Sequence, residues 1–117
     1  MLGFSDVTAL HALHAARGLE SIHGPVLTQL GDLGAETEAR AFRLLAGEAP
    51  EPYTALGPAL VGGRAVGPLV GGNLSVLISL LGTPFFPPLA GRILLLEDVG
   101  EATYRIDRML TQLILSG

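Results

Sequence analysis

Residues 1–23, MLGFSDVTALHALHAARGLESIH, read as the end of a strand, a helix and a second short strand. Asp6 can cap a helix over 7–17, and Gly18 can end it because glycine accepts a positive φ. The next strand is expected over 19–23. A strand, a helix and a strand in so few residues form a βαβ unit, whose strands run parallel. This stretch therefore predicts an α/β protein with a partial parallel sheet.

Two helices are expected in the first half of the chain. The first should pack on the face that carries Val7, Leu10 and His14, with Leu13 beside them. The second should run over 35–46, because acidic residues in its first turn and an arginine in its last turn match the helix dipole.

A proline-rich stretch, GEAPEPYTALGP, follows the second helix. Its composition is typical of a linker and gives the best candidate boundary in the chain. We therefore expect one unit over 1–48, a Pro/Gly linker over 49–57 and a second unit over 58–117. The elements expected in the second unit are two short strands around Gly62-Gly63, a helix over 74–81 capped by Asn73, a buried strand with 93–96 as its core, and an amphipathic helix over 103–115.

The composition excludes several kinds of chemistry. The chain has 117 residues, is 49% hydrophobic and carries a net charge of −4, so it can bury a core but lacks the basic surface that nucleic acids need. It contains no lysine and no cysteine, which excludes a Schiff-base lysine, a Ser-Lys dyad, disulfides and thiolate metal sites. No signal peptide and no apolar run long enough to span a membrane is visible.

Ser5 is the first candidate for chemistry. A serine between a strand and a helix N-terminus can be a nucleophile, since the helix directs free N–H groups at a developing oxyanion. The N–H of Asp6 would be the natural donor. GFSDV matches only half of the GxSxG nucleophile turn, because Val7 replaces the second glycine. The alternative is that Ser5 or Asp6 merely caps the helix.

Glu97 is the second candidate, at the exit of the predicted buried strand. A carboxylate there is costly to desolvate unless it is paired, so it either orients a histidine or accepts from nearby backbone N–H groups. Glu101 lies four residues further on, across a turn at Gly100, and is kept as a further candidate.

Three histidines could act as a base or as ligands. His11 and His14 have a spacing that could hold a metal, but no third ligand is evident nearby, so an ordinary helix face is favoured and no metal is expected. His23 ends the second strand of the βαβ unit, close to the expected position of Ser5. It could serve as the base or line the pocket.

Several motifs occur in one order that is similar to a known family. GFSDVTALH, HGP, GGNLSVLISLLGTP and ILLLEDVGEATYRIDRMLTQL together resemble the LD-carboxypeptidases, the serine peptidases that act on muramoyl tetrapeptides. The resemblance covers essentially the whole chain. It implies a cytoplasmic enzyme of cell-wall recycling that cleaves an L-D peptide bond to release the terminal D-alanine of murein tetrapeptide. It also implies a Ser-His-Glu triad without metal or other cofactor.

The resemblance implies roles for single residues. Ser5 would be the nucleophile, Glu97 the triad acid and the backbone N–H of Asp6 an oxyanion-hole donor. Asn73 and Glu101 would line the substrate pocket, where Glu101 could meet an ammonium group. A related branch of the family acts on a peptide–nucleotide antibiotic and has a different residue at that loop position, so an acid there favours murein.

Two departures from the family pattern bear on activity. The family's base histidine lies beyond the Glu97 motif, and its first strands lie before the Ser5 turn, so both fall outside this chain. The chain therefore resembles the centre of a two-domain enzyme, in which 1–48 ends the N-terminal nucleophile domain and 58–117 begins the C-terminal domain. We expect it to be inactive alone and to pair its exposed edges with the missing segments or as a homo-oligomer. The alternative hypothesis is a non-catalytic assembly module.

Overall fold

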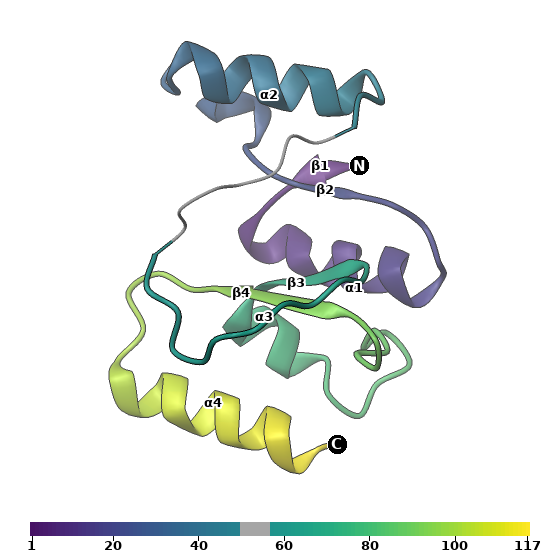
Figure 1. Cartoon of the computed structure of the whole chain (residues 1–117), viewed down its shortest axis with the longest axis vertical. Coiled ribbons are helices and arrows are strands. Elements are labelled where there is room, and N and C mark those ends of the chain that lie inside the picture. The colour runs from purple at the N-terminus through teal and green to yellow at the C-terminus, as the bar shows by residue number, and fades with distance from the viewer. Residues whose placement is uncertain (50–56) are drawn as a thin grey trace.

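A computed structural model describes residues 1–49 and 57–117 (Figure 1). The expected boundary falls mainly on residues 50–56, which lie outside the described residues, so the linker stays a prediction. In chain order the elements are β1 (Leu2–Gly3), the 3₁₀ turn η1 (Ser5–Val7), α1 (Thr8–Ala16), β2 (Ile22–His23), η2 (Leu27–Gln29), α2 (Ala35–Leu45), β3 (Leu69–Asn73), α3 (Leu74–Ser79), β4 (Ile93–Glu97) and α4 (Thr103–Leu115).

Two small parallel sheets organise the chain, which confirms the mixed α/β class. β1 pairs with β2, with Leu2 opposite Ile22 and Gly3 opposite His23. The predicted βαβ unit is therefore present, although its second strand is shorter than the expected 19–23. β3 pairs with β4 over five residues each, from Leu69 opposite Ile93 to Asn73 opposite Glu97.

The elements stack in layers in Figure 1, with α2 at the top, β1 and β2 next, then α1, then β3 and β4, and α3 and α4 at the bottom. α1 contacts β3 and α3, so it bridges the two sheets. The carboxyl ends of β1, β3 and β4 and the beginnings of α1, α3 and α4 all lie on the left in this view. This edge is where polar side chains from distant segments can meet. Among the described residues, no helix is long and apolar enough to cross a membrane.

The packed face of α1 differs from the expected one. Its buried residues are Thr8, His11 and Ala12, whereas Leu10 is 49% exposed. The reason is the neighbouring strand: a Cβ on Gly72 would lie 2.6 Å from Thr8 Oγ1. Helix and strand approach so closely that a small polar residue, and not a leucine, fits between them.

The predictions for the remaining helices were confirmed, whereas the prediction of strands around Gly62-Gly63 was not. Asn73 does cap α3, accepting a hydrogen bond from the Val76 N–H, and α2 and α4 lie where they were expected. The prediction of two strands around Gly62-Gly63 was wrong, because the one strand described in 57–73 is β3. Glycines at this density favour loops over paired strands.

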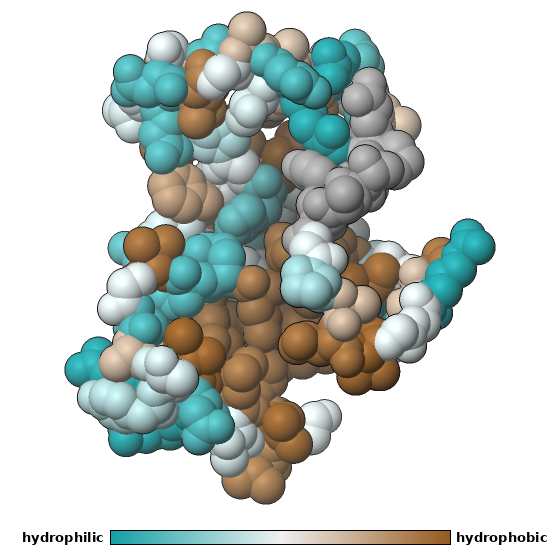
Figure 2. Space-filling model, turned by 60° about the vertical axis from the view of Figure 1, so that its left-hand side comes forward, coloured by the Kyte–Doolittle hydropathy of each residue, from teal (hydrophilic) through white to brown (hydrophobic). Residues whose placement is uncertain are grey.

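The prediction that β4 is buried was also wrong. Side chains alternate along a strand, and those of Leu69, Ile93 and Leu95 are 62%, 37% and 42% exposed. These side chains are therefore partly open to solvent in the described part of the chain. Figure 2 shows apolar surface gathered at the height of these strands and of α4.

The close approach of α1 and β3 can be tested at Gly72. We expect Gly72→Ala to lower the free energy of unfolding by about 1–3 kcal/mol or more, because its Cβ would overpack against Thr8 and its φ of +136° disfavours side chains. Gly82→Ala is the matched control, since Gly82 also has a positive φ but no atom lies within 4 Å of where its methyl group would stand. Urea unfolding followed by circular dichroism measures both; equal losses would contradict the packing argument.

Candidate active site

Ser5 stands on a strained turn between β1 and α1. Its φ is +56°, and no other non-glycine residue of the described chain has a positive φ. A non-glycine residue in this region costs on the order of 1–3 kcal/mol, and such strain concentrates at functional sites. Phe4 before it is extended, and η1 leads directly into α1. The arrangement is the strand–turn–helix geometry of a nucleophile turn.

The helix-cap interpretation of Ser5 and Asp6 was wrong. Asp6 lies inside η1, and the N-cap residues are Phe4 for η1 and Val7 for α1. Within the described part of the chain, neither Ser5 nor Asp6 makes a side-chain hydrogen bond, and both are exposed. The Ser5 hydroxyl is therefore available to a ligand.

The turn that carries Ser5 abuts the end of β3. The Asn73 N–H donates to Thr8 Oγ1 at 2.9 Å, and Thr8 is fully buried in the first turn of α1. η1 also contacts β3 directly. Because Asn73 is the register partner of Glu97, this contact brings the beginning of α1 to the carboxyl ends of both strands.

Glu97 ends β4 with one carboxylate oxygen unsatisfied. Its Oε1 is buried and has no hydrogen-bond partner among the described residues. This oxygen therefore does not accept a hydrogen bond from a nearby backbone N–H, as the alternative interpretation of Glu97 expected. Buried polar atoms are nearly always hydrogen-bonded, and the exceptions call for an explanation. Oε1 is a ready acceptor for a donor from outside the described residues.

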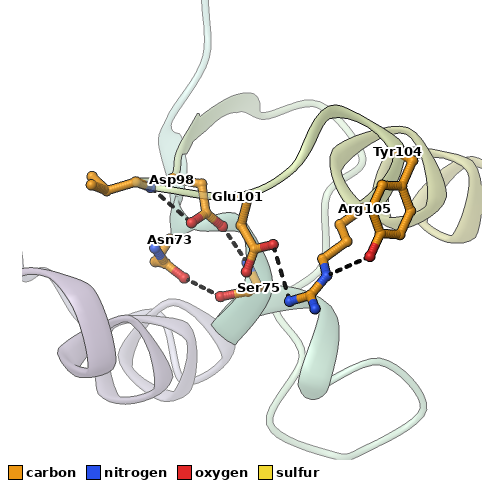
Figure 3. Close-up of polar contacts among 7 residues, drawn as sticks. Asn73, Ser75, Asp98, Glu101, Tyr104 and Arg105 are labelled. Atoms are coloured by element: carbon orange, nitrogen blue, oxygen red, sulfur yellow. Dashed lines mark hydrogen bonds and ion pairs between the residues drawn. The ribbon is translucent and has the colours of Figure 1, made fainter.

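Asn73, Ser75 and Asp98 form a polar network between β4 and α3 (Figure 3). Asn73 Oδ1 accepts from Ser75 Oγ at 2.7 Å and from the Val76 N–H at 3.1 Å. Asp98 Oδ2 accepts from the Ser75 N–H at 3.1 Å, and Oδ1 from the Val99 N–H at 2.8 Å. The network fixes the segment directly after Glu97 against the beginning of α3.

Glu101 lies beside this network and faces α4. Its Oε2 is 3.6 Å from Arg105 Nη1, and Arg105 Nε donates to Tyr104 Oη at 3.2 Å (Figure 3). The hydrogen bond to Tyr104, followed by the charge of Glu101, raises the pKa of Arg105. An open hollow of about 390 Å³ is lined by Glu101, Tyr104, Arg105, Arg108 and Met109. A cationic ligand for Glu101 would therefore compete with Arg105.

The histidines are placed differently from the expectation. His11 is not on an ordinary helix face: it is buried, with Nε2 2.8 Å from the Gly3 carbonyl oxygen and Nδ1 2.8 Å from Ser21 Oγ. His14 Nδ1 lies 2.8 Å from the Leu10 carbonyl of its own helix. His23 is exposed, and its ring centroid is 5.7 Å from that of His11. Across 1–49 and 57–117, none of the three hydrogen-bonds to Ser5 or Glu97.

The described residues also hold no group of three His, Asp or Glu side chains that could bind a metal ion.

Known proteins resemble this chain in sequence and in fold. Residues 66–117 match the family model of the LD-carboxypeptidase C-terminal domain. Over 98% of its length, the chain is 47% identical to the probable murein peptide carboxypeptidase of Bacillus subtilis. The chain belongs to the LD-carboxypeptidase family. It is also 43% identical, over 99% of its length, to the murein tetrapeptide carboxypeptidase of Pseudomonas aeruginosa, of which it covers 41%.

Solved structures of relatives have the same fold. The muramoyltetrapeptide carboxypeptidase of Oxalobacter formigenes superimposes with a TM-score of 0.77 over 99% of this chain, at 34% identity. An MccF-like protein of Bacillus anthracis gives 0.78 over 97%, at 26% identity. The chain spans 38% of the Bacillus subtilis relative's length and 40% of the Oxalobacter formigenes structure.

The structural roles of three residues that shape the site were missed by sequence reasoning: Thr8, His11 and Asp98. Thr8 and His11 are three residues apart, on one face of α1, and would have been found by treating polar residues at helical spacing as a packed face. Asp98 was not singled out from the sequence, yet its carboxylate accepts a hydrogen bond from the Ser75 N–H in the first turn of α3. No local pattern in the sequence indicates that contact, because 23 residues separate its partners.

The contact between Thr8 and Asn73 yields a measurable prediction. Thr8→Val keeps the shape of the side chain but leaves the Asn73 N–H without its acceptor, so we expect about 1–3 kcal/mol less stability. Thr8→Ser keeps the hydroxyl and should lose less. Thr111→Val, at an exposed position of α4, is the control for the change of residue type. If Thr8→Val and Thr111→Val unfold at the same urea concentration, the hydrogen bond contributes nothing.

Proposed function

We propose that this chain carries two of the three triad residues of a serine carboxypeptidase that releases the terminal D-alanine of murein tetrapeptide. The observation that carries the proposal is the placement of Ser5, on a strained turn, at the edge where Glu97 ends β4 with a buried, unpartnered carboxylate oxygen. In the Ser-His-Glu arrangement such an oxygen accepts from the imidazole of the base.

The reaction follows from these positions. Ser5 Oγ attacks the carbonyl carbon of the L-D peptide bond while its proton passes to the imidazole base. The oxyanion that forms is stabilised by the Asp6 N–H, one of the helix N-terminal donors that lack an intrahelical acceptor. Collapse breaks the C–N bond, and the imidazolium gives its proton to the departing amine of D-alanine. Water then hydrolyses the acyl-enzyme by the same route.

The base histidine is proposed to come from outside residues 1–117. Both ring nitrogens of His11 already have partners in β1 and before β2, and His14 contacts its own helix. His23 faces the His11 ring and has no hydrogen bond to Ser5 or Glu97 within the described residues. Since removing the base from a triad leaves only weak residual catalysis, the chain alone should be almost inactive.

Murein peptide is the favoured substrate over a peptide–nucleotide antibiotic. The relatives named for murein or muramoyl peptides are 34–47% identical to this chain, whereas the MccF solved with glutamyl sulfamoyl guanosine is 23% identical. Glu101 supports the same choice, because its carboxylate could bind an ammonium group of the peptide once Arg105 turns away. Asn73 would contribute its side-chain amide nitrogen, since its Oδ1 is occupied by α3. The proposed setting is the cytoplasm, with no cofactor.

The proposal predicts activity only when the site is complete. We expect a version extended at both ends to release D-alanine from a diaminopimelyl tetrapeptide, and the 117-residue chain to release almost none. In the extended version, Ser5→Ala and Glu97→Gln should each lower kcat by about 10⁴-fold, because each removes a triad function.

Matched controls are Ser79→Ala and Glu20→Gln, both at exposed positions away from the strand ends. A D-alanine assay measures all six proteins. The short chain could instead be fully active and lose that activity in His23→Ala. The base would then lie within the chain, and the proposal that it comes from outside residues 1–117 would be overturned.

We also infer that the partly open face of β3–β4 is covered in solution, by the rest of the enzyme in the extended version and by a second copy in the short chain. Leu69, Ile93 and Leu95 present a contiguous apolar face there, and exposed strands pair readily with other chains. A short chain that acted only through this face would be the non-catalytic assembly module.

Light scattering tests this inference at tens of micromolar protein. We expect the short chain to exceed its monomer mass and Leu95→Glu to reduce the association, because a charge in a buried apolar face is costly. Glu substitution at exposed Leu27, in η2, is the control. A monomeric short chain at these concentrations would contradict the inference.

A further inference from the structure

The left-handed backbone of Ser5 has to be held by contacts around it, since an unconstrained serine would leave that region. Two of these contacts meet at Gly3, the last residue of β1, which lies two residues before Ser5. Its carbonyl oxygen accepts from the Gly24 N–H at 3.0 Å and lies 2.8 Å from His11 Nε2. Both lone pairs of this oxygen are therefore used, one by the residue directly after β2 and one by α1.

The partners of His11 fix which nitrogen carries its proton. A carbonyl oxygen only accepts, so Nε2 must be the N–H donor to Gly3. In the neutral ring Nδ1 is then an acceptor, and the Ser21 hydroxyl donates to it at 2.8 Å. Ser21, immediately before β2, thus selects the tautomer that can bond to β1.

We propose that His11 is a positioning residue that braces the Ser5 turn by tying the Gly3 carbonyl, two residues before the serine, to α1, the helix that follows the turn. The brace spans eight residues and closes the segment that contains Ser5 into a loop. It leaves the Ser5 hydroxyl free, because His11 contacts the backbone and not the nucleophile. This proposal rests on the proposed function for its catalytic consequence, but its structural content concerns the turn alone.

The surroundings keep His11 neutral. Burial is the main cause that lowers its pKa, and the charges of His23 on β2, His14 on α1 and the Met1 amino group lower it further, against the Gly3 hydrogen bond, which raises it. The unfolded chain therefore binds a proton at a pH where the folded chain does not. Stability linked to His11 is complete above about pH 6.5 and falls as the pH drops from there to the folded pKa.

The tautomer is tested first, in the unchanged 117-residue chain, by the ¹⁵N shifts of its imidazoles. We expect Nε2 of His11 to be protonated and Nδ1 to be unprotonated, and the ring to be neutral at pH 6.5, because burial lowers its pKa. A ring protonated on Nδ1 alone could not donate to Gly3 and would refute the brace. This measurement needs no variant and no activity.

Variants test whether the brace holds the turn. The readout is the intraresidue HN–Hα Overhauser effect of Ser5, which is strong only for a positive φ. We expect His11→Ala to weaken it and His11→Gln, whose amide can donate to Gly3, to preserve it at least in part. His14→Ala is the matched control on the same helix, since its ring hydrogen-bonds to the Leu10 carbonyl of that helix and not to Gly3. An unchanged Ser5 signal in a folded His11→Ala would overturn the proposal.

Kinetics of the extended enzyme connect the brace to catalysis. Because small misplacements of a nucleophile are costly, we expect His11→Ala to lower kcat by about 100-fold with KM nearly unchanged, and His11→Gln to recover part of the loss. Equal changes in kcat for His11→Ala and His14→Ala would count against a positioning role. If no version releases D-alanine while the tautomer and the Ser5 signal behave as expected, the proposed function fails and the brace stands.

Discussion

The close contact between the first turn of α1 and the glycine end of β3 is the constraint on which the rest of the molecule depends. Thr8 adds little bulk and offers one acceptor, and the Asn73 N–H uses it across 65 residues of sequence. Gly72 makes the approach sterically feasible. Without this contact the Ser5 turn and the end of β4 would belong to two separately packed pieces. With it, residues from both halves of the chain share one edge.

The sequence allowed the parallel βαβ unit, the Asn73 cap and the long helices to be predicted, because each depends on local signals such as turn residues and helical spacing. The packed face of α1 could not be predicted in the same way. Periodicity arguments look for leucines, and here a glycine-rich strand selects Thr8 and His11 instead. The burial of β4 was over-predicted for a related reason: a run of apolar residues indicates what a strand can bury, but not what is there to cover it.

Some features of the candidate site could likewise be predicted from the sequence, and others could not. Ser5 and Glu97 were found from their positions at the ends of predicted strands, and the family resemblance gave them roles. The strain at Ser5 and the unpartnered Oε1 of Glu97 are visible only in three dimensions. Both break rules that most of a fold obeys, and such exceptions gather where function demands them. His11 illustrates the opposite case, since its type suggested chemistry while its contacts are those of a brace.

The site depends on the register in which β3 pairs with β4. A slip of one residue along a strand turns every side chain to the opposite face. The side chain of Glu97 would then lie on the opposite face of the sheet from its present one. The site would be lost although every helix and strand remained intact. Gly71 favours the observed register, because a side chain at this position would collide with the Leu95 carbonyl oxygen of the paired strand. The position of the Glu97 carboxylate therefore depends on the alignment of two short strands and not only on their formation.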